Sequence, residues 1–130
     1  MKIDYSLELI NITKKFDSRN VVENLNLSIL PGKVTCLLGP SGCGKSTTLR
    51  IAAGLEEQDS GIVKINGNLI SEPKVCHLPP EKRNIGFMFQ DFALFPHLTV
   101  KKNIEFGITG NKYESFDNFS TDHILKKIGL

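Results

Sequence analysis

The sequence has 130 residues, a length that suits one domain and excludes a two-domain enzyme. Hydrophobic residues make up 40% and charged residues 23% of it, values that are normal for a folded globular protein and exclude a disordered chain. The formal net charge is +2, and the basic residues do not cluster, so no nucleic-acid partner is expected.

Targeting and redox signals are also weak. The longest unbroken apolar run, residues 92–95, is far shorter than the ~20 residues that span a bilayer. Asp4 and Glu8 interrupt the stretch where a secretory signal would be apolar. The 3 cysteines form no Cys-x-x-Cys pair, which predicts neither a disulfide framework nor a zinc site. We therefore expect a reduced, cytosolic protein that is not integral to a membrane.

The first predicted elements are two strands at residues 7–16 and 21–29, in which apolar residues partly alternate. The turn-forming residues 17–20 separate them and predict an antiparallel pair. Pro31-Gly32 then breaks the chain. Residues 34–38 are apolar and β-branched throughout, which predicts a fully buried strand.

A helix is predicted over residues 45–55, because apolar residues recur there at helical spacing and Gly54 stands where helices commonly stop. The stripe that should face the core consists of Thr48, Ile51, Ala52 and Leu55. Residues 61–66 and 68–70 flank Gly67 and predict a second hairpin.

The carboxyl-terminal part begins with a proline-rich loop that leads into a predicted strand at residues 85–89. Helices are predicted at residues 99–106 and 121–128, with a polar loop at residues 107–119 between them. The second of these helices has Asp122 near its start and two lysines near its end, as the helix dipole favours. Together the elements predict an α/β fold with an antiparallel β portion at the front.

The most informative stretch, residues 39–46, matches the phosphate-binding pattern G-x-x-x-x-G-K-[ST] between a predicted buried strand and a predicted helix. Such a loop points backbone N–H groups and the positive end of a helix dipole at phosphate oxygens. Lys45 would supply charge to the β- and γ-phosphates, and Ser46 would complete the coordination of Mg²⁺. The predicted binding residues are Gly39, Pro40, Ser41, Gly42, Cys43, Gly44, Lys45, Ser46 and Thr47. The alternative is a glycine-rich turn that merely joins a strand to a helix.

Together with the sequence around it, this loop resembles the amino-terminal half of an ABC-transporter ATPase subunit. The matching stretches are Gly39–Thr47, the following TLRIAAGLEEQDSGIVKINGN, and NIGFMFQDFALFPHLTV at residues 84–100. PPEKRNIGFMFQ is similar to importers of the ferric-iron, sulfate, polyamine and sugar group. The resemblance implies a P-loop NTPase core with an antiparallel β subdomain, cut within the helical subdomain. Residues 1–130 would then be a partial nucleotide-binding domain.

The resemblance also implies roles for single residues. Phe16 stands where the family stacks an aromatic ring on adenine; the alternative is an ordinary core aromatic. Gln90 stands where a glutamine reaches Mg²⁺ and the attacking water, so Lys45 and Gln90 would be the catalytic residues; the alternative for Gln90 is a polar strand cap. The apolar residues expected to meet a membrane subunit, or else to be core, are Phe92, Leu94, Phe95 and Leu98.

The implied function is an ATPase that uses Mg-ATP to drive uptake of a solute, with ferric iron as one guess. Its partners would be a transmembrane permease subunit and a second ATPase subunit, at the inner face of the cell membrane. The family's Leu-Ser-Gly-Gly-Gln signature and Asp-Glu-ended strand do not occur in the sequence. We therefore expect that this chain binds phosphates but hydrolyses them poorly, and that residues 34–38 find no partner strand.

Two other functions stay open: a non-catalytic remnant, and a GTP-binding switch protein, which is suggested by the near match of residues 111–114 to the guanine-reading motif N-K-x-D. A thermal melt with and without Mg-ATP separates a binding domain from a remnant. His77, His97 and His123 lie apart and receive no role. Cys43 lies within the phosphate loop, so its alkylation is expected to block ATP binding.

Overall fold

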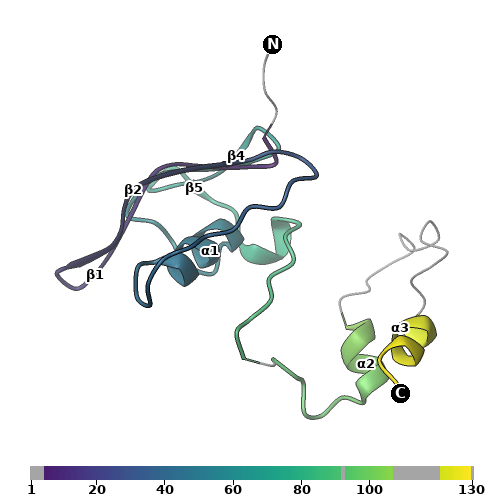
Figure 1. Cartoon of the computed structure of the whole chain (residues 1–130). Helices are drawn as coiled ribbons and strands as arrows, with labels where there is room; N and C mark the ends of the chain where they lie inside the picture. The colour runs from purple at the N-terminus through teal and green to yellow at the C-terminus, as the bar shows by residue number, and fades with distance from the viewer. Residues whose placement is uncertain (1–4, 92, 107–120, 130) are drawn as a thin grey trace. The chain divides into compact units, whose positions relative to one another are not determined.

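The computed structural model describes residues 5–91, 93–106 and 121–129. The chain divides into two compact units, Met1–Phe87 and Met88–Leu130. The first unit holds a β-sheet, a helix and a short 3₁₀ turn, η1 (Pro80–Lys82). The second holds two short helices (Figure 1).

The sheet of the first unit has 5 strands in the order β2-β1-β3-β4-β5, and every neighbouring pair is antiparallel. The strands are β1 (Leu7–Phe16), β2 (Arg19–Ile29), β3 (Ser60–Ile65), β4 (Asn68–Glu72) and β5 (Cys76–His77). Both predicted hairpins are confirmed. In the β3–β4 turn, Asn66 and Gly67 have φ angles of 48° and 76°, as a type I′ hairpin turn requires.

The helix of the first unit, α1 (Lys45–Ala53), lies against one face of the sheet (Figure 1). The buried apolar cluster between them consists of Leu9, Ile12, Val22, Ile51, Ala52 and Val63. The predicted stripe on the helix is confirmed for Thr48, Ile51 and Ala52, which are buried. It is wrong for Leu55, which is 42% exposed, because the helix ends at Ala53 and the chain turns at Gly54.

Two predicted strands are wrong. Residues 34–38 and 85–89 have no strand conformation, and Val34, Leu38 and Met88 are more than 90% exposed. The physical reason is that a strand needs a neighbour to satisfy its N–H and C=O groups. Among the described residues no strand pairs with either segment.

The second unit contains α2 (Val100–Glu105) and α3 (Thr121–Lys127), close to the two predicted helices. Thr99 caps α2, because its hydroxyl accepts a hydrogen bond from the Lys102 amide at 3.3 Å. An ion pair of 3.4 Å joins Lys101 Nζ to Asp122 Oδ1. The predicted loop at residues 107–119 lies outside the described residues.

The turn before α2 is held by one side chain. Asn103 Oδ1 accepts from the Phe95 amide at 2.9 Å, and Asn103 Nδ2 donates to the carbonyls of Phe95 and Leu98 at 3.2 and 3.1 Å. The Phe95 ring also packs on the Phe106 ring, with centroids 4.2 Å apart. Phe95 and Leu98 are thus half-buried within this unit, whereas Leu94 is 64% exposed.

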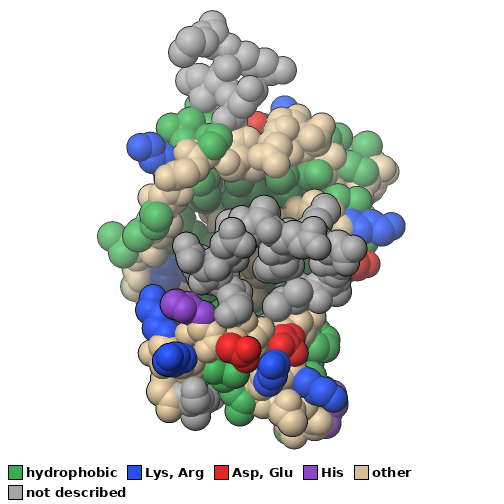
Figure 2. All heavy atoms as spheres, turned by 90° about the vertical axis from the view of Figure 1, so that its right-hand side faces the viewer, with side chains coloured by type: hydrophobic (Ala, Val, Ile, Leu, Met, Phe, Trp, Pro, Cys, Tyr) green, Lys and Arg blue, Asp and Glu red, His purple; other side chains and the backbone are tan. Residues whose placement is uncertain are grey.

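Hydrophobic side chains reach the surface between charged ones, as the face in Figure 2 shows. The exposed large apolar residues include Leu69, Val75, Leu94, Val100 and Ile128. In the described ranges, no helix combines the length and the apolar composition that crossing a membrane requires.

Candidate functional site

The predicted phosphate loop leads directly into α1. Gly44 is the N-cap of the helix and has a φ of 92°, a conformation that favours glycine. A Cβ atom at this position would lie 2.4 Å from the Val21 carbonyl oxygen of β2. Only glycine therefore allows the loop to pass this close to the sheet.

Lys45, Ser46 and Thr47 form the first turn of α1. The N–H groups of a first helical turn have no acceptor within the helix, and the positive end of the helix dipole lies beside them. These backbone donors are therefore available to an anion. The structure thus brings together the residues that the motif predicted.

The Lys45 side chain folds back over the loop. Its Nζ donates to the carbonyl oxygens of Gly39 at 2.8 Å and Pro40 at 2.7 Å, and to Cys43 Sγ at 3.5 Å. The loop residues 39–43 are mostly exposed, so the ammonium lies at an accessible face. Helix amides and a fixed ammonium form a donor set that fits a polyphosphate.

The predicted Mg²⁺ ligands fall in different units. Ser46 lies exposed at the second position of α1, and its hydroxyl oxygen is a ligand type that Mg²⁺ accepts. Gln90 is exposed at the start of the second unit, so its approach to the loop stays a prediction. Across residues 5–91, 93–106 and 121–129 no group of three or more His, Cys, Asp and Glu side chains could hold a metal ion.

Phe16 is the last residue of β1 and its side chain is 43% exposed. The alternative of an ordinary core aromatic does not fit this exposure. Phe16 pairs with Arg19 at the start of β2, and Val21 of the same strand contacts Gly44 closely. The same end of the β1–β2 hairpin therefore carries the aromatic ring and borders the phosphate loop.

Arg83 is a buried charged residue at the other end of α1 that the sequence reasoning missed. It is 2% exposed, and its guanidinium donates from Nη1 to the carbonyls of Ile51 and Ala52 at 2.9 and 3.0 Å, and from Nε to the Leu78 carbonyl at 2.6 Å. Burial lowers the pKa of this guanidinium below its ordinary value, while the nearby Cys76 acts in the opposite direction. Arg83 thus places a cation at the carboxyl end of α1, where the helix dipole is negative.

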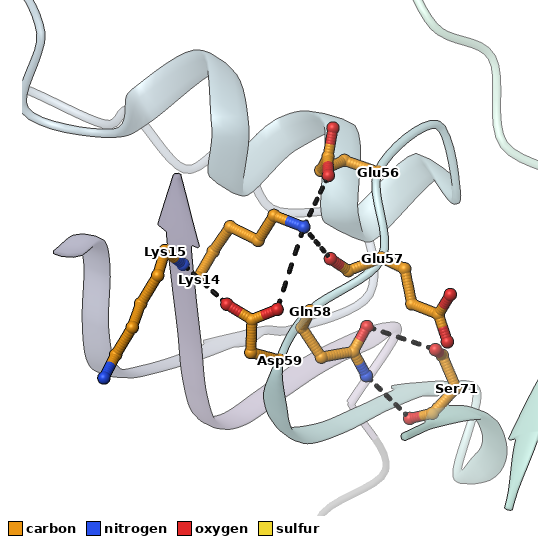
Figure 3. A network of polar contacts seen from close by, with 7 residues as sticks. All are labelled: Lys14, Lys15, Glu56, Glu57, Gln58, Asp59 and Ser71. Carbon is orange, nitrogen blue, oxygen red and sulfur yellow. Dashed lines mark hydrogen bonds and ion pairs between the residues drawn. The ribbon is translucent and has the colours of Figure 1, made fainter. Parts of the chain in front are cut away.

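A buried polar network beside Arg83 was also missed. Gln58 is 3% and Ser71 1% exposed. The Ser71 hydroxyl donates to Gln58 Oε1 at 3.1 Å, and Gln58 Nε2 donates to the Ser71 carbonyl at 3.2 Å (Figure 3). His77 Nδ1 lies 3.2 Å from Ser71 Oγ and 3.4 Å from Arg83 Nη2. His77 therefore belongs to a network that holds the chain after α1.

The sequence contained one signal for Arg83. Arg83 lies inside PPEKRNIGFMFQ, where it supported the resemblance without receiving a role. Its partners are backbone carbonyls, which leave no residue pattern to search for. The stretch at residues 111–114, which suggested a guanine motif, lies outside the described residues.

Comparison with known proteins points to the same family as the resemblance seen in the sequence. The model of the family described as "ABC transporter" matches residues 22–130. The spermidine/putrescine import ATP-binding protein PotA of Acetivibrio thermocellus is 48% identical over 100% of this chain and 36% of its own length. The Fe(3+) ions import ATP-binding protein FbpC of Brucella abortus is 40% identical over 96% of this chain and 34% of its own. The sulfate/thiosulfate import ATP-binding protein CysA of Synechocystis sp. is 46% identical over 83% and 29%.

Solved structures agree on the fold. A nucleotide-free ATP-binding cassette from an ABC transporter superposes with a TM-score of 0.50 at 32% identity, over 53% of this chain and 28% of its own. The cassette MJ1267 gives 0.51 at 30% identity, over 54% and 27%. The chain spans about a third of the length of the curated relatives it matches. The predicted resemblance is thus confirmed, and the chain belongs to the ABC transporter family, with the fold of its ATP-binding cassettes.

Proposed function

We propose that this chain binds Mg-ATP at residues 39–47 as part of the ATPase of a solute importer. The observation that supports this proposal is the Lys45 ammonium held by the Gly39 and Pro40 carbonyls at the amino end of α1. A polyphosphate would replace these neutral acceptors with charged ones, which form stronger hydrogen bonds to an ammonium. Family membership supports the same ligand.

Different residues would bind different parts of the nucleotide. The exposed ring of Phe16 would stack on the adenine. The first-turn amides and Lys45 would hold the phosphates, and Ser46 and Gln90 would hold Mg²⁺. When bound, Mg²⁺ neutralises charge on the β- and γ-phosphates.

Hydrolysis is expected to be weak in this chain. The sequence contains no Asp-Glu dipeptide, the pair that the family would use to hold Mg²⁺ and to accept a proton from water. A phosphate loop without a general base can position the nucleotide but adds little to the rate of hydrolysis. We therefore propose binding as the activity of the chain itself. Hydrolysis at the rate of a full-length relative would contradict this.

Family membership supports the general kind of partner but does not identify the solute. We propose a transmembrane permease and a second ATPase subunit as partners, at the inner face of the cell membrane, as import ATPases require. The exposed Leu94 is available for a contact of this kind. The relatives are named for polyamine, sulfate and iron import. Their names give ferric iron no preference over the other two solutes.

The test is Lys45→Ala, with Mg-ATP binding measured by calorimetry. Loss of a charge-assisted hydrogen bond of about 1.5–3 kcal/mol should weaken binding about 10- to 100-fold. Lys33→Ala removes an exposed lysine from the segment before the loop and serves as the control. Unchanged affinity of a folded Lys45→Ala variant would refute the proposal.

Alkylation of Cys43 in a chain with Cys36→Ser and Cys76→Ser should also abolish binding, because the adduct would fill the loop.

A further inference from the structure

Phe16 has a charged neighbour. Lys14 lies two residues earlier in β1. Its Nζ lies 5.1 Å from the centroid of the Phe16 ring, within the range of a cation–π interaction. A planar ring has two faces, and an ammonium over one of them leaves the other for a base.

The position of this ammonium is closely defined. Lys14 Nζ lies 2.7 Å from Glu56 Oε1, donates to the Glu57 carbonyl at 2.8 Å and lies 3.9 Å from Asp59 Oδ1 (Figure 3). The Lys14 side chain is only 13% exposed. It is therefore less exposed and has more partners than an ordinary surface lysine, whose ion pairs contribute little.

The residues that hold Lys14 come directly from α1. After the helix ends, the amides of Leu55 and Glu56 donate to the Arg50 carbonyl at 2.9 and 3.3 Å. Asp59 then joins the end of β1, because its Oδ2 accepts from the Lys15 amide at 2.6 Å and its own amide donates to the Thr13 carbonyl at 2.9 Å. One short segment thus connects the helix of the phosphate loop to the strand end that carries Phe16.

We propose that Lys14 is a positioning residue for base stacking: pinned by Glu56 and Glu57, it occupies one face of the Phe16 ring and directs the adenine to the other. This inference rests on the proposed function. Lys14 is not one of the phosphate-loop residues 39–47, and the partners of its ammonium are Glu56, Glu57, Asp59 and the Phe16 ring. Its contribution should therefore depend on the presence of a base in the ligand.

The experiment compares Mg-ATP with Mg-tripolyphosphate, which has the phosphates but no base, by calorimetry on the whole chain. Lys14→Met keeps the aliphatic stem and removes the charge. A cation–π interaction of ~0.5–1 kcal/mol predicts that Mg-ATP binding weakens about two- to fivefold, with tripolyphosphate binding unchanged. Lys14→Arg keeps a cation and should retain most of the affinity.

Lys15→Met is the matched control. The Lys15 side chain points away from the network, and only its backbone amide takes part (Figure 3). Binding of both ligands should stay at the wild-type level. In a chain that already has Phe16→Ala, Lys14→Met should have no further effect on Mg-ATP binding, because Lys14 acts through the ring.

The outcomes are distinguishable. If the wild-type chain binds Mg-ATP and Lys14→Met binds it equally well, the role of Lys14 is overturned, whereas the proposed function is not. Equal losses for Mg-ATP and Mg-tripolyphosphate, or additive effects with Phe16→Ala, overturn it as well, because they indicate a general charge or folding effect. If wild-type chain binds neither ligand, the proposed function fails and the inference fails with it.

Discussion

The β1–β2 hairpin and the segment at residues 34–38 have similar β-forming sequences but different structures. The hairpin pairs along its length from Leu7 and Ile29 to Phe16 and Arg19, and it contributes three residues to the core. Residues 34–38 have no strand conformation and expose Val34 and Leu38 almost completely. Apolar, β-branched composition is therefore insufficient to make a strand.

The difference lies in the source of the partner. The hairpin brings its own neighbour across a two-residue turn, so its ladder forms from adjacent sequence. A buried parallel strand needs a neighbour from a distant part of a chain. The described residues supply no such neighbour to residues 34–38. Stability should thus reside in the sheet and α1, and the predictions below test this contrast.

The largest effect is expected for a core leucine. Leu9 is 1% and Leu38 91% exposed, so the same substitution can be made in both regions. Leu9→Ala should lower the free energy of unfolding by about 2–5 kcal/mol, because it removes buried methyl groups and leaves a cavity. Leu38→Ala should change it by less than about 0.5 kcal/mol. Urea denaturation followed by circular dichroism measures both, and equal effects would contradict the contrast.

Arg83→Met should cost about 2–3 kcal/mol in the free energy of unfolding, because the Ile51, Ala52 and Leu78 carbonyls lose a buried charged donor. Arg50→Met is the control, since Arg50 lies exposed in the last turn of the same helix. It should cost at most about 1 kcal/mol through the helix dipole. Chemical denaturation of the two variants side by side gives the comparison. A smaller loss of unfolding free energy for Arg83→Met than for Arg50→Met would show that the hydrogen bonds of Arg83 to the end of α1 contribute little to stability.

Two glycines extend the comparison between the regions. Gly54 has a φ of 82°, and a Cβ there would lie 2.5 Å from Arg83 Nε. Gly54→Ala should therefore destabilise by about 1–3 kcal/mol. Gly86 lies in a segment without strand conformation, where a Cβ would meet nothing within 4 Å. Gly86→Ala should stay within about 0.5 kcal/mol of wild type, as thermal melts can determine.

The smallest effect on stability is expected for Val34→Lys. Val34 is 93% exposed, so the new charge should change the free energy of unfolding by less than about 0.5 kcal/mol. Self-association should nevertheless fall, because charge on an unpaired β-forming segment opposes edge-to-edge pairing. Light scattering over a concentration series measures this. Unchanged scattering would show that residues 34–38 do not drive association.

Local sequence rules predicted the elements whose partners are close by. The turn at Gly67, the stop of α1 near Gly54 and the start of α2 near residue 99 all depend on neighbouring residues. The phosphate loop was found for the same reason, because its donors are consecutive backbone amides. The wrong predictions concern residues 34–38 and 85–89, where the local pattern was suitable but the outcome depended on distant chain.

The candidate site shows the same limit. Lys45, Ser46 and Phe16 could be named from motif and resemblance, since each has a specific sequence context. The network of Lys14 with Glu56 and Asp59 crosses more than 40 residues of sequence. Arg83 reaches the Ile51 and Ala52 carbonyls over a separation of 32 and 31 residues. Contacts of this kind follow from tertiary packing, and no local pattern announces them.

Helix α1 has glycines in the left-handed conformation at both ends, Gly44 at its start and Gly54 at its finish. Both are held by close neighbours, so neither boundary has room to shift along the sequence. One inserted residue would rotate the two ends against each other by about 100°, the turn that each residue adds to an α-helix. The phosphate end and the arginine end of α1 are therefore kept in a constant rotational register, and the helix tolerates exchange of side chains far better than any change in its length.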